Sequence, residues 1–168
     1  MIRNQTIWKG ALVFTGILIA YNLFLDFVLR TQGGVSNNYQ SLVCALGIFY
    51  TLFEYRKEQG SLRTVEGFKV GYLAVLLGGF VYSVYTSAYL NFIRPEEKIK
   101  IMDFQMEMLK KQSFSEQELE QIASLGKVFF EPIPLVFVSW LALLISCSFP
   151  ILMLSFIMRT PKDKNQAS

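Results

Sequence analysis

Residues 133–158 read IPLVFVSWLALLISCSFPILMLSFIM, a run of 26 positions without a charged side chain. As an α-helix this run would be about 39 Å long, which exceeds the roughly 30 Å thickness of a bilayer's hydrocarbon core. An uninterrupted apolar stretch of this length is typical of a membrane span. Residues 133–158 are therefore predicted to cross a membrane, with some tilt or protrusion to accommodate the extra length.

Three further apolar stretches share this character, at residues 7–29, 40–55 and 68–93. The four stretches hold more than half of the 168 residues, but only four of the charged side chains: Lys9, Asp26, Glu54 and Lys69. An unpaired charge in hydrocarbon costs several kcal/mol, so a membrane protein places its charges in the connecting segments. Although hydrophobic residues make up only 52% of the chain, this segregation excludes a soluble globule. It predicts one all-α integral membrane domain over residues 1–168, with four transmembrane helices.

The stretch 40–55 is the shortest of the four. Its 16 residues would give a helix of about 24 Å, which falls below the usual minimum of about 17 residues for a span. A re-entrant or interfacial segment is the alternative. However, the interior of the stretch, residues 42–49, has no polar face, which argues against a helix lying flat at the interface. Four spans remain the expectation.

Basic residues near the helix ends predict the orientation in the membrane. With four spans, the N-terminus, residues 56–67 and the C-terminal tail share one side. That side carries nine basic residues: Arg3, Lys9, Arg56, Lys57, Arg63, Lys69, Arg159, Lys162 and Lys164. Short cytoplasmic loops are enriched in lysine and arginine. Both termini are therefore expected in the cytoplasm.

The long segment between the third and fourth stretches is expected outside, as helices over about residues 95–127. Pro95 suits a first helical turn, and apolar residues follow at helical spacing, at Ile99, Met102, Met106 and Leu109. A second start signal follows, with Ser115 and Glu118 as a capping box and Phe114 placed to pack on Leu119. Two amphipathic helices must cover their apolar faces on each other, on the membrane surface or on a partner.

Two polar residues stand out inside the first apolar stretch. Asn22 and Asp26 are four residues apart, so they share one helix face near its predicted outer end. A carboxylate beside an amide in a membrane could form a proton or cation site. The alternative is that Asp26 forms an interfacial pair with Arg30, which is again four residues away.

The third stretch carries small residues at intervals of four or eight positions. The stripe consists of Gly67, Gly71, Gly79, Ser83 and Ser87. Small residues let another helix backbone approach closely, and packing drives helix association in lipid. The stripe predicts contact either with another helix of this chain or with a partner helix. On a neighbouring part of the surface, Tyr82, Tyr85 and Tyr89 are interpreted as aromatic anchors at the outer interface.

Catalytic and metal-binding patterns are missing from the sequence. The chain has no histidine and only two cysteines, Cys44 and Cys147, which are interpreted as buried structural thiols. Counted from the helix starts, their depths should differ by about 15 Å, so no disulfide is expected between them. We expect no catalytic residue, cofactor or metal site, and thus no enzyme. The basic cluster around Arg56 suits anionic lipid headgroups and not nucleic acid.

Several short motifs give the chain a family resemblance. They are Gly67-Phe68-Lys69-Val70-Gly71, the end of the third stretch from Tyr89 to Ile93-Arg94-Pro95, the segment Ser113-Phe114-Ser115-Glu116-Gln117-Glu118-Leu119, and Gly10 with Gly16. With them, the order of elements resembles the domain-of-unknown-function family 4199, small membrane proteins found chiefly in Bacteroidota. The resemblance implies a bacterial inner-membrane protein of about four helices. It brings no activity and no catalytic residues.

Two functional hypotheses follow from these features. The first is a non-enzymatic assembly partner or accessory subunit that uses the small-residue stripe and residues 95–125 as contact surfaces. Its partners would be the lipid bilayer and either a second copy of the chain or another membrane protein, and the sequence identifies no small-molecule ligand. The alternative is a small transporter or channel subunit that oligomerises to form its path, with Asn22 and Asp26 at the outer mouth.

Overall fold

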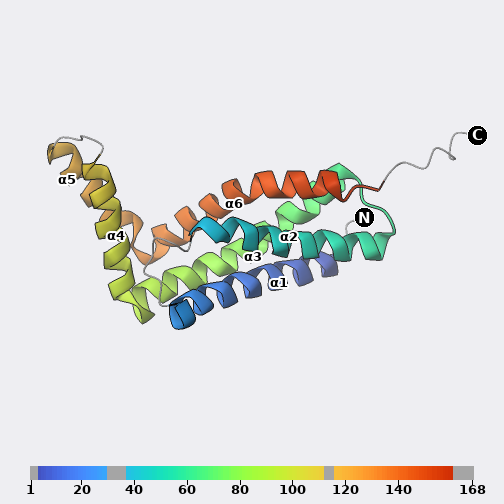
Figure 1. Ribbon diagram of the computed structural model, residues 1–168, viewed down its shortest axis with the longest axis horizontal. Helices are drawn as coiled ribbons and strands as arrows, with labels where there is room; N and C mark the ends of the chain where they lie inside the picture. The colour runs from blue at the N-terminus through green and yellow to red at the C-terminus, as the bar shows by residue number, and fades with distance from the viewer. Residues whose placement is uncertain (1–3, 30–36, 112–115, 161–168) are drawn as a thin grey trace, which may run out of the picture.

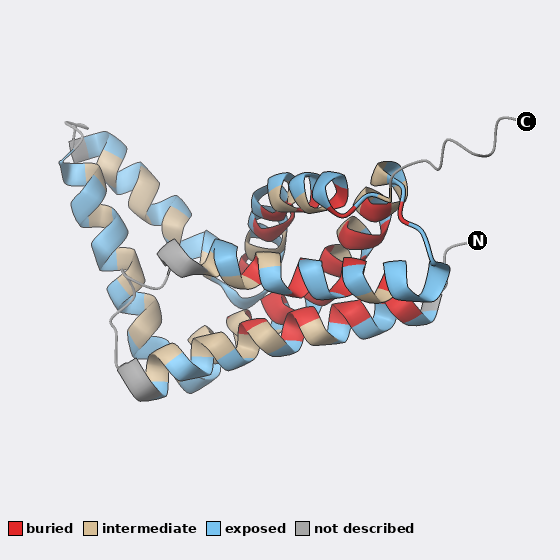
Figure 2. Cartoon of the chain, turned by 45° about the vertical axis from the view of Figure 1, so that its right-hand side comes forward, coloured by how far each residue is buried: buried red, intermediate tan, exposed pale blue. Residues whose placement is uncertain are grey.

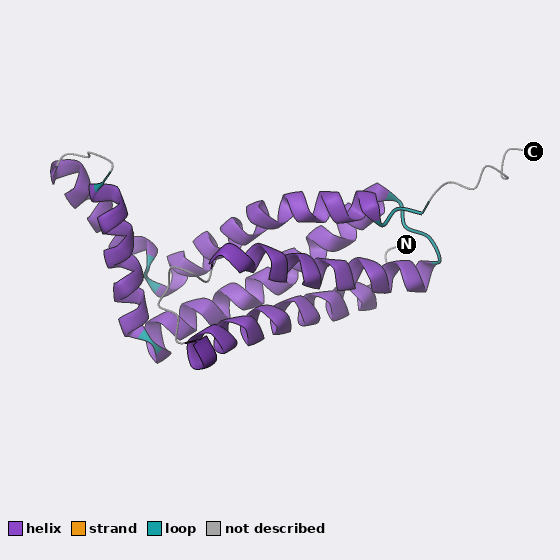
Figure 3. Ribbon diagram, in the orientation of Figure 1, coloured by secondary structure: helices purple, strands orange, loops and turns teal. Residues whose placement is uncertain are grey.

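The structure is a computed structural model that describes residues 4–29, 37–111 and 116–160. Figure 3 shows that the secondary-structure elements of these residues are helical, which confirms the predicted all-α class. The elements are α1 (Asn4–Phe24), the π-helical turn η1 (Leu25–Leu29), α2 (Asn37–Gln59), α3 (Thr64–Ala88), the π-helical turn η2 (Tyr89–Ile93), α4 (Pro95–Lys110), α5 (Glu116–Phe129) and α6 (Pro132–Ile157).

The four long helices α1, α2, α3 and α6 lie side by side as a bundle (Figure 1). Helices α4 and α5 extend away from one end of this bundle, transverse to its long axis. The start of α1 and the end of α6 lie at the opposite end. The chain therefore has a bundle and a projecting pair of helices, here called the α4–α5 hairpin.

Three helical segments are long and apolar enough to cross a membrane: Gln5–Phe27, Thr64–Ile93 and Pro132–Ile157. They indicate a multi-pass membrane protein. Helix α2 is not among them, because the segment is polar at both ends, with Asn37 and Asn38 at one and Arg56 and Lys57 at the other. It is nevertheless 23 residues long, which is longer than the predicted stretch 40–55.

Proline sets the start of two helices, as the sequence predicts. Pro95 occupies the first turn of α4, and Pro132 occupies the first turn of α6. A proline costs little there, because the first amides of a helix have no intrahelical acceptor. Pro150 lies inside α6, which continues beyond it to Ile157. The predicted cap of α5 involves Ser115 and Phe114, which lie outside the described residues.

Helix α3 is central to the bundle and packs most extensively on α6 and α1. Its closest backbone approach is at Gly78, where an added Cβ would lie 2.6 Å from the carbonyl oxygen of Ala11. Similar crowding joins α1 to α2, since a Cβ on Gly10 would lie 2.5 Å from the Thr51 side chain. Because lipid tails are as apolar as a protein core, such close packing stabilises a membrane bundle more than burial alone.

The buried side chains lie inside the bundle, and the α4–α5 hairpin has none among its described residues (Figure 2). The largest fully buried apolar side chains are Phe14, Leu18, Ile48, Leu52, Leu62, Ile151, Val70 and Val75. At the end that carries the start of α1, two backbone-anchored hydrogen bonds of 2.9 Å join Leu62, in the loop after α2, to Thr160, just after α6. The bundle is thus tied together at the end away from the hairpin.

Candidate functional site

The two polar residues of α1 and η1 contact side chains of α3 and η2. The amide of Asn22 donates a hydrogen bond to the Tyr82 hydroxyl, and the Tyr89 hydroxyl donates one to Asp26 Oδ2. Arg94 Nη2 lies 3.0 Å from Asp26 Oδ1. The predicted partner of Asp26, Arg30, lies outside the described residues. The structure thus gives Asp26 two partners that are far away in the chain.

Arg94 is the centre of a cluster of charges at this end of the bundle. Besides Asp26, its guanidinium contacts Glu96 at 2.7 Å and Glu97 at 3.7 Å. Lys100 pairs with Glu97 at 3.0 Å. Desolvation would lower the pKa of Arg94, but these carboxylates, Asp26 foremost, together with Tyr89 raise it above the ordinary value. The guanidinium therefore stays charged and faces three carboxylates.

The hydrogen bond between the Tyr89 hydroxyl and Asp26 Oδ2 joins two π-helical turns. Asp26 belongs to η1, and Tyr89 begins η2. A π-helical turn shifts the side chains that follow it relative to a regular helix, and such turns are frequent at functional sites. A regular helical pattern predicts α-helix through both positions, so neither turn was expected from the sequence. The two turns face each other across the α1–α3 contact.

The three tyrosines of α3 and η2 form a row that faces the bundle. Their ring centroids are 6.3 Å apart for Tyr82 and Tyr85, and 5.7 Å apart for Tyr85 and Tyr89. Tyr82 is buried, and Tyr89 is half-buried against Asp26. The interpretation of the row as aromatic anchors at the outer interface does not describe Tyr82, which is buried inside the bundle. Tyr82 and Tyr89 instead contact the polar face of α1 and η1, which the sequence of α3 alone does not reveal.

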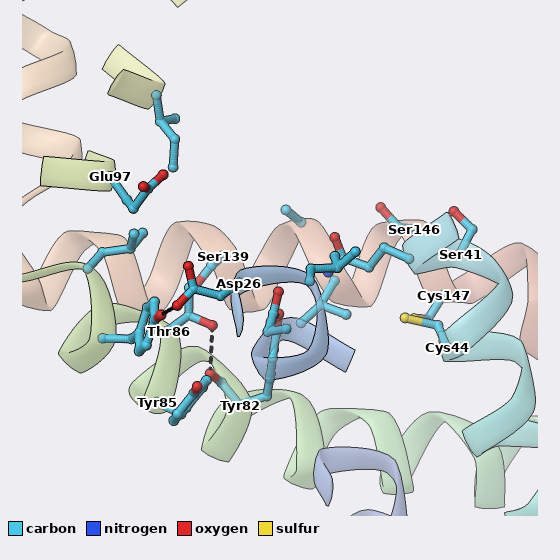
Figure 4. Close-up of a pocket in the computed structure, with 18 of the residues that line it drawn as sticks. Asp26, Ser41, Cys44, Tyr82, Tyr85, Thr86, Glu97, Ser139, Ser146 and Cys147 are labelled. Atoms are coloured by element: carbon cyan, nitrogen blue, oxygen red, sulfur yellow. Dashed lines mark hydrogen bonds between the residues drawn. The ribbon is translucent and has the colours of Figure 1, made fainter. Parts of the chain in front are cut away.

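A cavity of about 610 Å³ lies beside this row, among α1, α2, α3, α6 and the start of α4. Figure 4 shows the side chains that line it, with the carboxylates of Asp26 and Glu97 toward one end and the two cysteines toward the other. Hydroxyl groups line much of the remainder. The polar residues of the lining are Asn22, Asp26, Gln40, Ser41, Tyr82, Tyr85, Thr86, Tyr89, Glu97, Ser139 and Ser146.

One buried polar atom of the described cavity lining has no hydrogen-bond partner. The Tyr85 hydroxyl is buried and has no hydrogen-bond partner among the described residues, whereas its neighbours Tyr82 and Tyr89 contact Asn22 and Asp26. A buried hydroxyl without a partner costs about 1–3 kcal/mol, so such groups commonly mark a place that a ligand or water fills. The cavity therefore offers an unused hydrogen-bonding group.

Cys44 and Cys147 both line the cavity, where Figure 4 shows their side chains next to each other. Both are free and buried. The expectation that they differ in depth by about 15 Å is wrong. Helix α2 begins at Asn37 and not at residue 40, and it is displaced along the bundle relative to α6 (Figure 1), which brings Cys44 next to Cys147 (Figure 4).

The small-residue stripe of α3 faces other helices of this chain. Gly67 and Gly71 lie against Ser155 and Ile151 of α6, and Gly79 is near Trp140. The Ser87 hydroxyl donates to the Pro132 carbonyl oxygen at 2.7 Å, and Ser83 is fully buried. Gly78, which the stripe omits, makes the tightest backbone contact. The stripe therefore lies within the bundle.

Metal ligands do not gather in residues 4–29, 37–111 or 116–160. These ranges hold no group of three or more cysteine, aspartate or glutamate side chains that could bind a metal ion. The cavity also contains no lysine or arginine among its described lining residues. Its chemistry is that of two carboxylates, hydroxyls, amides, thiols and aromatic rings.

Comparison with known proteins places the chain in a family. No curated protein and no solved structure matches it. Residues 9–160 match the family described as "Protein of unknown function (DUF4199)". This range extends from the first turns of α1 to just beyond α6, and so covers every helix of the bundle and the α4–α5 hairpin. The resemblance found in the sequence is confirmed, and the protein belongs to the DUF4199 family.

Proposed function

We propose that the protein is a non-enzymatic multi-pass protein of the bacterial inner membrane, with four spans and both termini in the cytoplasm. The position of α2 inside the bundle supports a fourth span, because 23 residues make a helix of about 34 Å. The concentration of basic residues at the end opposite the hairpin supports the orientation. The lack of histidine and the burial of both cysteines support a role without catalysis.

Within the membrane, the protein acts as an assembly partner or accessory subunit that makes contact through the α4–α5 hairpin. The observation that carries this proposal is the exposure of large apolar side chains on a hairpin that projects from the bundle (Figure 1). They are Ile99, Phe104, Met108, Leu125, Val128 and Phe129. Large apolar side chains exposed on an element outside the bundle are candidates for an interaction site. The sequence suggests two contact surfaces, the small-residue stripe of α3 and residues 95–125. Since the stripe packs inside the bundle, the proposed contact surface is the hairpin.

Photocrosslinking in native membranes tests this role. A benzophenone side chain introduced at Phe104, which is 53% exposed on α4, should give a protein adduct of discrete mass, either with another membrane protein or with a second copy. The same group at Leu12, which is 70% exposed on α1 within the bundle, serves as the lipid-facing control. Adducts with lipid alone at both positions would remove the basis for the assembly role.

A second candidate function rests on a different observation. The cavity of about 610 Å³ contains Asn22 and Asp26 at one end of the bundle, which favours a small transporter or channel subunit that completes its path by oligomerisation. Reconstituted proteoliposomes should then support a solute or proton flux that Asp26→Asn reduces. Impermeable proteoliposomes would exclude this alternative without affecting the assembly role.

A further inference from the structure

We propose that the cavity lined by Asp26, Glu97 and the tyrosine row is a binding site for an ammonium group, carried either by a small free amine or by a phosphatidylethanolamine headgroup. The site is independent of the α4–α5 assembly role, because none of the exposed apolar side chains of the hairpin lines the cavity. It is also independent of transport, since binding needs no path through the bilayer.

The balance of charge selects a cation. Asp26 and Glu97 both line the cavity, and no lysine or arginine does so among the described residues. The single guanidinium of Arg94 is shared between these two carboxylates and Glu96. Lys100 offsets part of this excess, but its side chain is 49% exposed, so water screens it. Lys98 donates a hydrogen bond to Asn91 and, like Lys100, does not line the cavity, so the charged side chains of the described lining are both negative.

The aromatic lining favours an organic cation. Ammonium groups are attracted to the faces of tyrosine rings within about 6 Å, and Tyr82, Tyr85 and Tyr89 present consecutive rings along one wall. The Tyr85 hydroxyl, which has no partner among the described residues, can accept a hydrogen bond from an ammonium N–H. An ammonium group placed between Asp26 and Tyr85 would give the Tyr85 hydroxyl a partner and add a further donor to the Asp26 carboxylate, which already binds Tyr89 and Arg94.

Size and composition disfavour the other classes of ligand. A metal ion would need a cluster of ligands that the described residues do not provide. A purely apolar molecule would leave the Tyr85 hydroxyl without a partner. A volume of about 610 Å³ lies in the range of pockets for small organic molecules.

Titration of the purified full-length protein with ethanolammonium tests the free-amine source. Propan-1-ol, which replaces the ammonium with a methyl group, is the neutral control. Saturable binding of ethanolammonium at least about tenfold stronger than that of propan-1-ol is expected. Asp26→Asn and Glu97→Gln should each weaken it several-fold, whereas Asp103→Asn, an exposed carboxylate of α4 outside the cavity, should leave it unchanged.

Tyr85→Phe provides a variant that does not depend on the ion pair. It removes a hydroxyl that makes no hydrogen bond with the described residues, so the melting temperature of the folded protein should not fall. Ethanolammonium binding should nevertheless weaken several-fold, because the ammonium loses its acceptor. Unchanged binding in this variant, with a normal melting temperature, would overturn the placement of the ammonium at Tyr85.

Native mass spectrometry from nanodiscs distinguishes the headgroup source. Preferential retention of phosphatidylethanolamine over phosphatidylglycerol, lost in Asp26→Asn and competed by ethanolammonium, would assign the site to the lipid headgroup. Saturable ethanolammonium binding without lipid preference would assign it to a free amine. Equal affinity for ethanolammonium and propan-1-ol, together with equal retention of both lipids, would overturn the proposal.

Discussion

Asp26 and Arg94 form an ion pair across 68 residues of sequence, with 3.0 Å between Oδ1 and Nη2. The pair joins the π-helical end of the first helix to the turn between η2 and α4. Since the Tyr89 hydroxyl binds the other oxygen of Asp26, the carboxylate holds two neighbouring elements in place. This contact fixes the end of the bundle from which the α4–α5 hairpin projects.

Removal of the guanidinium should loosen this end of the bundle. Arg94→Gln leaves three carboxylates, including the half-buried Asp26, without their shared cation, so the melting temperature in detergent should fall. Lys100→Gln removes a more exposed ion pair and should have a smaller effect. A larger decrease in melting temperature for Arg94→Gln than for Lys100→Gln is expected. An equal decrease would contradict the assigned role of Arg94.

Two adjacent glycines of α3 should respond differently to alanine. Gly78→Ala places a methyl group 2.6 Å from a backbone oxygen of α1 and should destabilise the bundle by about 1–3 kcal/mol. Gly79→Ala meets Trp140 at an ordinary 3.6 Å and should be neutral, or stabilising by up to about 1 kcal/mol through helix propensity. Denaturation in mixed micelles measures both values. Equal effects would mean that α1 does not approach α3 at Gly78.

The two cysteines should form an internal crosslink. Treatment with copper phenanthroline should join Cys44 and Cys147 and remove two hydrogens from the intact mass, because the two side chains lie next to each other in the cavity lining (Figure 4). Cys44→Ala is the control and should leave Cys147 open to alkylation after denaturation. If both thiols of the oxidant-treated wild type can still be alkylated after denaturation, the alignment of α2 with α6 is wrong.

Topology reporters should decide whether α2 spans the membrane. Fusions after Gly34 and Gln112 should report the external side, and fusions after Gly60 and Ser168 should report the cytoplasm. If the Gly34 and Gly60 reporters lie on the same side of the membrane, α2 does not cross the bilayer. An external reporter at Ser168 would instead reverse the proposed orientation.

Features that depend on residues close together in the sequence were predictable. The segregation of charges marks the apolar helices, and prolines at positions 95 and 132 mark where α4 and α6 begin. These signals act within one helix, through hydrophobicity and backbone geometry. The first turn of α2 lies outside the apolar stretch 40–55, because Asn37 and Asn38 are polar and do not belong to an apolar run.

The composition of the candidate site was only partly predictable. Asn22 and Asp26 stand out because polar residues in a span are costly, and both line the cavity. Their partners Tyr82, Tyr89 and Arg94 could not be identified, since helix periodicity gives the face of a residue but not the helix that it meets. The π-helical turns η1 and η2 add a local rotation that a regular period cannot describe.

Local chemistry thus sufficed for the membrane character of this protein, its helical class and the polar exceptions of its first helix. Tertiary packing alone decided which residues those exceptions meet, why Gly78 and not Gly79 contacts α1, and why Cys44 lies next to Cys147. The physical reason is that hydrophobic segregation acts residue by residue along each helix. The axial shift and rotation between helices follow instead from the packing of all their surfaces together.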